Sequence, residues 1–128
     1  MVSGQPNSNS EAARRFLGAW RYAGMTIDGK PGTTRGTNPK GILIYDASGH
    51  MAVHVAPGGD ATAMNHTAYF GTWSIDAQAA TITHSKDGRV LPDEGEVVVR
   101  GYTFAGDRLI YRPLEATTNI EIIWERIT

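Results

Sequence analysis

The chain has 128 residues, of which 41% are hydrophobic, and a formal net charge of −1. This length and composition predict one globular domain with its own core and leave no room for a second. Twelve basic residues are scattered among thirteen acidic ones, so there is no broad basic face to grip a phosphate backbone, and nucleic acid is not an expected partner. The absence of cysteine excludes disulfides, thiolate metal sites and a cysteine nucleophile.

The start of the chain is rich in Ser, Asn, Gly and Pro, which predicts a flexible tail at residues 1–9 before a single domain at residues 10–128. The sequence contains neither a signal-peptide pattern nor an apolar run long enough to span a membrane, so we expect a cytoplasmic protein without a membrane partner. Ser8 precedes Glu11 by three residues, a spacing that favours a short capped helix running into Phe16 and Leu17.

Short runs rich in Val, Ile, Thr, Tyr and Trp then recur between Gly, Asp and Pro clusters. Eight strands are predicted, at residues 16–27, 41–46, 50–55, 70–76, 80–85, 96–104, 108–113 and 119–127. Tight hairpins are expected at 46–49, 76–79 and 105–106, and long loops at 28–40, 57–69 and 86–95. This order predicts an all-β fold, an eight-stranded antiparallel up-and-down β-barrel, with the long loops flanking its mouth.

Counting outward from each tight turn predicts which side chains face the interior, because directly paired residues share a face. A turn at 76–79 pairs Gly71 with His84, which turns the histidine inward and leaves space beside its imidazole. A four-residue turn at 46–49 pairs Ile44 with Met51 and places Tyr45 outside. The predicted interior is mostly apolar with a few polar groups, as in small-molecule sites.

The candidate catalytic residues are His84, Arg100, Tyr102 and Tyr111. The candidate ligand-binding residues are Tyr22, Ile44, Met51, Val53, Trp73, Val98, Leu109, Ile122 and Trp124. His84 is either an acid or base or a hydrogen-bonded core histidine. Arg100 either pairs with a carboxylate of the protein or binds an anionic oxygen of the ligand, because an unpaired buried charge is costly. The tyrosines are expected to orient the ligand through their phenols.

Metals and cofactors are not expected. His50 and His54 have the spacing of a helical zinc motif, but on a strand their positions are about 13 Å apart. The glycine-rich stretch at 29–36 lacks the spacing of a phosphate-binding loop. His66 and Tyr69, in the long loop at 57–69, either close over a bound molecule or are exposed. The sequence does not fix the oligomeric state.

Several stretches together resemble the stand-alone bacterial lipocalin-like domain family. They are "GAW" at 18–20, "GILIYDASGHMAVHV", "AYFGTWSID", "TITH", "GDRLIY" and "IIWERI", and they span roughly residues 16–127. Gly101 departs from the family pattern, which has a larger residue there. The resemblance implies a lipocalin barrel in which Arg126 packs across Trp20, and a function either as a carrier of small hydrophobic molecules or as a cofactor-free enzyme such as a cyclase or isomerase.

Three functions are therefore open. One is a cofactor-independent isomerase, cyclase, lyase or epoxide-opening enzyme that uses His84 with a tyrosine or Arg100 on a small apolar oxygenated molecule. The second is a non-catalytic binding or carrier protein for a small hydrophobic ligand. The third is a filled barrel that acts as a structural or interaction module.

Overall fold

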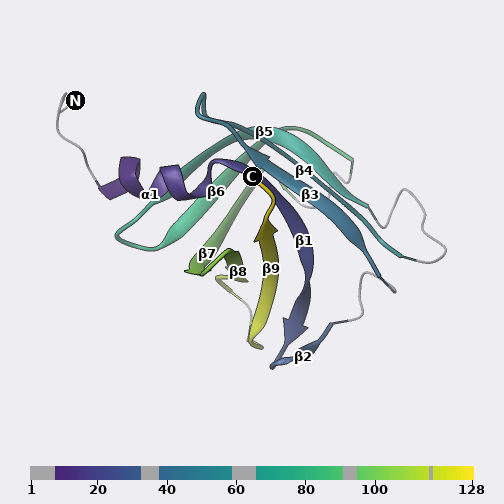
Figure 1. Cartoon of the computed structure of the whole chain (residues 1–128). Coiled ribbons are helices and arrows are strands. Elements are labelled where there is room, and N and C mark those ends of the chain that lie inside the picture. Colours follow the sequence, from purple (N-terminus) through teal and green to yellow (C-terminus); the bar gives the residue numbers. More distant parts are fainter. Residues whose placement is uncertain (1–7, 33–37, 59–65, 91–94, 116) are drawn as a thin grey trace.

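The structure is a computed structural model that describes residues 8–32, 38–58, 66–90, 95–115 and 117–128. Its elements are α1 (Ser8–Phe16), β1 (Gly18–Ile27), β2 (Lys30–Pro31), β3 (Lys40–Tyr45), β4 (His50–Ala56), β5 (Thr67–Asp76), β6 (Thr81–Arg89), β7 (Val97–Ala105), β8 (Arg108–Pro113) and β9 (Ile120–Arg126) (Figure 1). Residues 1–7 of the expected tail lie outside the described residues, and the helix already includes positions 8 and 9.

The eight long strands form a closed barrel. Apart from the two-residue β2, each strand pairs antiparallel with the next along the chain, and β9 returns to pair with β1. β2 pairs only with the end of β1, at Thr26 and Ile27. The predicted all-β, up-and-down barrel with a short N-terminal helix is confirmed, and the arrangement is that of a lipocalin-like fold. No helix in the described part of the chain is long and apolar enough to cross a membrane.

One end of the barrel is closed by α1 and a layer of aromatic side chains. Phe16, the last residue of α1, is fully buried and makes edge-to-face contacts with Tyr102 and Phe104, both at 4.9 Å between ring centroids. The carbonyl of Phe16 accepts a hydrogen bond from Trp20 Nε1 at 2.8 Å. This end lies where β1 begins and β9 ends (Figure 1).

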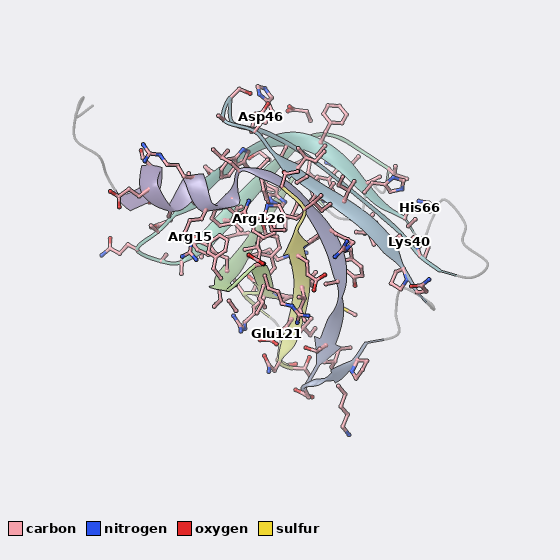
Figure 2. All side chains as sticks on the ribbon, viewed as in Figure 1. Arg15, Lys40, Asp46, His66, Glu121 and Arg126 are labelled. Atoms are coloured by element: carbon pink, nitrogen blue, oxygen red, sulfur yellow. The ribbon has the colours of Figure 1, made fainter. Side chains whose placement is uncertain are left out.

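Arg126 stabilises the closed end and packs against Trp20, as the resemblance implies. Its guanidinium lies 4.1 Å from the ring of Trp20 and donates to the carbonyl of Leu17 at 2.9 Å. Figure 2 places it between α1 and β9, whereas Asp46 marks the β3–β4 hairpin and His66 and Lys40 lie at the other ends of those strands. Arg126 therefore holds the helix against the barrel, and we assign it no role in ligand binding.

The predicted facing of β3 is wrong by one residue. The loop after β3 has three residues between Asp46 and His50, which are joined by a backbone hydrogen bond of 3.0 Å, and Gly49 adopts a positive φ of 91°. Tyr45 therefore pairs with Met51. A one-residue shift turns a strand over, so Ile44 points outward and is 42% exposed, while Tyr45 is buried.

The predicted register of β5 against β6 is also wrong, but by two residues, so the inward face is preserved. His84 pairs with Trp73, and Gly71 pairs with Lys86. β6 carries one additional residue, Asp87, opposite the step from Phe70 to Gly71. A Cβ on Gly71 would lie 1.9 Å from the carbonyl oxygen of Ser85, so this glycine permits close strand contact and does not make room for the imidazole.

Candidate functional site

Four side chains from four different strands meet inside the barrel. His84 on β6 lies between two phenols: Tyr45 Oη is 2.5 Å from Nε2, and Tyr69 Oη is 2.6 Å from Nδ1. Tyr45 Oη also forms a short hydrogen bond with Tyr111 Oη. These contacts form one continuous series, Tyr69, His84, Tyr45 and Tyr111, which we call the phenol–imidazole chain.

Strand alternation explains how the sequence builds this chain. On β6, Ile82, His84 and Lys86 are buried in turn, while the residues between them are more exposed. Tyr111 follows the same rule on β8, two residues after the fully buried Leu109. Each of these four strands contributes one inward side chain, so the phenol–imidazole chain crosses the barrel interior.

Burial keeps His84, Tyr45 and Tyr111 in their neutral forms. Burial, together with the nearby positive charges of Arg100 and Lys86, lowers the pKa of His84 to about 3. Burial likewise raises the pKa of Tyr45 well above its ordinary value. The pKa of Tyr111 is raised for the same reason, although Arg100 opposes the shift. At neutral pH the imidazole is uncharged, with one nitrogen donating and the other accepting.

A cavity of about 50 Å³ adjoins the phenol–imidazole chain. Its lining residues are Tyr22, Leu43, Val53, Val55, Thr67, Tyr69, His84, Arg100, Tyr111, Ile122 and Trp124. This volume accommodates about one water molecule or one functional group of a ligand, not a whole ligand. The interior is thus more completely filled than the sequence predicted. Trp124 Nε1 is buried without a hydrogen-bond partner among the described residues, which costs about 1–3 kcal/mol unless a water or ligand oxygen pairs with it.

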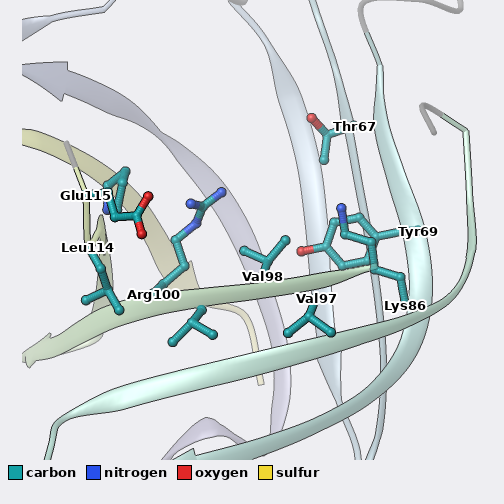
Figure 3. Close-up of a pocket in the computed structure, with 10 residues that line it drawn as sticks. Thr67, Tyr69, Lys86, Val97, Val98, Arg100, Leu114 and Glu115 are labelled. Atoms are coloured by element: carbon teal, nitrogen blue, oxygen red, sulfur yellow. The ribbon is translucent and has the colours of Figure 1, made fainter. Parts of the chain in front are cut away.

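A larger pocket of about 610 Å³ opens beside the small cavity. The two share the lining residues Thr67, Tyr69 and Arg100. Figure 3 shows Arg100 extending from β7 between Glu115 and Val98, with Tyr69 and Lys86 side by side across the pocket. A ligand head near Arg100 would therefore reach the small cavity while its body occupied the larger pocket.

The pocket carries positive charge near its inner end. Lys86 is only 8% exposed, and its Nζ lies 4.4 Å from the centre of the Tyr69 ring. Arg100 is half-buried, and within the described residues no carboxylate forms an ion pair with it. Glu115 also lines the pocket but is exposed. A half-buried guanidinium with no carboxylate partner in the described part of the chain favours an anionic oxygen from a ligand.

The structure brings together some of the predicted site residues and separates others. His84, Arg100 and Tyr111 line the small cavity with Tyr22, Val53, Ile122 and Trp124, and Val98 lines the larger pocket. Met51, Trp73 and Leu109 also face inward, but they pack in the core away from these cavities. The predicted inward position of Ile44 is wrong.

Tyr102 is not a member of the phenol–imidazole chain, although it pairs directly with Tyr111 on the neighbouring strand. It faces inward as predicted, but its ring packs against Phe16 and Phe104 at the closed end. Burial raises its pKa, while the charge of Arg15, on the helix, opposes this rise and that of Asp76, at the end of β5, adds to it. Tyr102 and Arg100 share the inward face of β7 but do not belong to one site, because successive inward residues are about 7 Å apart along a strand.

Three side chains of the candidate site are not predicted there by the sequence: Tyr45, Lys86 and Tyr69, the last of which is expected only in a loop that closes over a bound molecule or is exposed. The sequence predicts Tyr45 outside because a four-residue turn is expected at 46–49; Gly49, which adopts a positive φ at the end of the loop, is the residue that indicates a three-residue loop. The sequence predicts loops at Tyr69 and Lys86, whereas β5 begins at Thr67 and β6 extends to Arg89. Both segments have a polar composition, which does not indicate a strand.

The remaining histidines lie outside this site. His54, which is exposed, and His66, which is half-buried, approach each other, with Nε2 of the first 2.7 Å from Nδ1 of the second. No cluster of three or more potential metal ligands occurs among the described residues.

Comparison with known proteins adds no assignment. No family model matches the chain, and no curated protein matches it. The geometry of the site is therefore the basis for proposing a function.

Proposed function

We propose that this protein binds a small, mostly apolar molecule with an oxygen-bearing head in the open end of the barrel and performs cofactor-independent acid–base chemistry on it. Isomerisation, cyclisation, elimination and epoxide opening all belong to this class. The resemblance to the bacterial lipocalin-like family fits the same proposal. The proposal includes a bacterial origin and a cytoplasmic location, which are supported only by the sequence.

The observation that carries the proposal is the convergence of Arg100, His84 and two phenols on one small cavity beside a larger pocket. Arg100 supplies a charge for a ligand carboxylate or a developing oxyanion, and the phenols supply hydrogen bonds in a site of low polarity. Apolar walls from Val53, Ile122 and Trp124 would exclude water from the reacting group.

A second candidate is binding without chemistry. The low pKa of His84 favours it, because an effective general base has a pKa near the working pH, and an imidazole with a pKa of about 3 is a weak base. The two functions share the ligand and the pocket. They differ in whether the bound compound is converted.

The test uses terpenoid epoxides, enones, aromatic acids and fatty acids, with neutral alcohols of the same skeletons. Binding is followed by tryptophan fluorescence, because Trp124 lines the cavity, and each mixture is analysed by mass spectrometry. We expect at least one acid to bind saturably, and Arg100→Gln to weaken acids about tenfold or more while sparing the neutral analogues. Arg21→Gln, on an exposed side chain paired with Glu125, is the matched control.

Conversion of a bound compound that disappears in His84→Asn would establish the enzyme. Saturable binding with every compound recovered intact would favour the carrier. If no compound binds, or if Arg100→Gln binds acids as tightly as the wild type, the proposed function is wrong.

A further inference from the structure

The two ends of the phenol–imidazole chain open into the same cavity. Tyr69 and Tyr111 are its terminal members, and both line the 50 Å³ cavity. Tyr45, which connects His84 to Tyr111, is 1% exposed and packs against Trp73 at 4.8 Å between ring centroids. The chain therefore runs from the cavity into the core and back to the cavity.

The four side chains of the phenol–imidazole chain carry one more exchangeable proton than the hydrogen bonds between them use. Three phenols and one neutral imidazole carry four exchangeable protons, and the chain contains three hydrogen bonds. In one orientation Tyr69 donates to Nδ1, Nε2–H donates to Tyr45, and the proton of Tyr111 is directed out of the chain. In the other orientation every hydrogen bond is reversed, and the proton of Tyr69 is directed outward.

We propose that the phenol–imidazole chain is a neutral proton relay that interconverts the keto and enol forms, and hence the double-bond isomers, of enolisable carbonyl compounds. This inference rests on the proposed function, since it requires a carbonyl compound in the cavity. It assigns Tyr69 and Tyr111 as catalytic residues and Tyr45 as a positioning residue behind them.

The enolisation step is balanced within the substrate and the chain. Tyr111 gives its proton to the carbonyl oxygen, while Tyr69 Oη accepts the proton from the acidic carbon. The electrons of the broken C–H bond form the new C=C bond, and the former C=O π electrons form the new O–H bond. Three further protons shift by one position: from Tyr45 to Tyr111, from Nε2 to Tyr45, and from Tyr69 to Nδ1.

The step leaves the chain neutral and in its opposite orientation. Tyr69 can now return a proton to carbon, and Tyr111 can accept the enol proton. If the proton returns to a different carbon of a conjugated enol, the product is a double-bond isomer, and the chain has regained its starting state. Arg100 beside this cavity stabilises negative charge that develops on the substrate oxygen.

The neutral mechanism also accounts for the electrostatics of the site. A conventional histidine base would have to become an imidazolium, which burial and the charges of Arg100 and Lys86 oppose. A relay needs the imidazole to remain neutral, because only then does it both donate and accept. The features that make His84 a poor isolated base therefore suit it to pass a proton between two phenols.

The experiment measures deuterium exchange at the acidic carbon of phenylpyruvate, an enolisable α-keto acid, by NMR in D2O. Hydrocinnamate, which has the same aryl and carboxylate groups but no ketone, reports binding alone. The variants are Tyr45→Phe and His84→Gln, since a glutamine amide donates and accepts but does not pass on a proton. Tyr102→Phe removes an inward phenol at the closed end and is the matched control.

We expect the wild type to accelerate exchange and Tyr45→Phe and His84→Gln each to lower kcat about 100-fold, with KM and hydrocinnamate affinity retained. Rates in H2O–D2O mixtures should vary non-linearly with deuterium content in the wild type, since several protons move together. They should vary linearly in Tyr45→Phe, and Tyr102→Phe should behave as the wild type.

Three outcomes would overturn the relay. They are unaccelerated exchange in the wild type, exchange in Tyr45→Phe as fast as in the wild type, and a Tyr45→Phe variant whose rate and hydrocinnamate affinity fall together. If hydrocinnamate binds through Arg100 while phenylpyruvate is not accelerated, the relay fails and the binding site stands. If neither compound binds, the proposed function fails with it.

Discussion

Gly71 offers a direct test of the strand register that builds the site. The substitution Gly71→Ala adds a Cβ that would lie 1.9 Å from the carbonyl oxygen of Ser85 and 3.0 Å from the backbone nitrogen of Asp87. Both neighbours are backbone atoms of β6, so no side chain can move aside. To reach ordinary contact, β5 and β6 would have to separate locally by roughly 1.5 Å.

That separation sets the expected cost. It would disrupt about one net hydrogen bond, worth about 1 kcal/mol, and add an overpacking term of about 2–3 kcal/mol. We therefore expect Gly71→Ala to lower the free energy of unfolding by about 3–4 kcal/mol. For a domain of this size, that corresponds to a fall in Tm of about 12–16 °C.

Gly101→Ala is the matched control, because Gly101 also lies in a strand and its nearest neighbour to an added Cβ is the Arg112 carbonyl oxygen at 3.7 Å, an ordinary contact. We expect its stability to stay within about 1 kcal/mol of the wild type. Both variants are measured by urea and thermal denaturation with circular dichroism. If Gly71→Ala is as stable as Gly101→Ala, the register of β5 on β6 is wrong, and the space beside His84 expected from the sequence is correct.

Two further predictions concern His84 and β3. In the unfolded chain His84 has its ordinary pKa of 6.5, whereas in the folded protein its pKa is about 3. Between these two pH values the unfolded state therefore binds more protons than the folded state. As a result, the stability of the folded protein falls as the pH drops from 6.5 towards 3. From pH 7 to pH 5 this group should contribute a loss of about 2 kcal/mol that is absent in His84→Gln, and an imidazole resonance titrating near pH 6.5 would contradict it. Leu43→Ala, at a fully buried position, should cost about 2–5 kcal/mol, whereas Ile44→Ala, 42% exposed, should cost less than about 1 kcal/mol in the same denaturation assay. If Ile44→Ala cost more stability than Leu43→Ala, Ile44 would face the interior as the sequence predicts.

Whether the sequence predicts the correct inward-facing side chains depends on the predicted lengths of the turns. The facing of β7 and β8 followed correctly from the short turn between Ala105 and Arg108, because two plausible turn lengths gave the same faces. For β5 and β6, an error of two residues in register left His84 on the correct face. For β3, an error of one residue exchanged Ile44 with Tyr45, and one member of the phenol–imidazole chain was missed.

The sequence by itself determined the fold class, the order of the strands and the inward direction of His84, Arg100 and Tyr111, because these follow from local alternation and turn composition. Only the tertiary structure decided that Tyr111 and not Tyr102 joins His84, that Tyr45 and Tyr69 complete the chain, and that the cavity beside it holds about 50 Å³. The reason is that barrel closure, register and bulges set which inward residues are neighbours, and side-chain packing then directs the ring of Tyr102 onto Phe16 although it pairs with Tyr111. A two-residue period specifies the face of a strand but carries no information about height along the barrel.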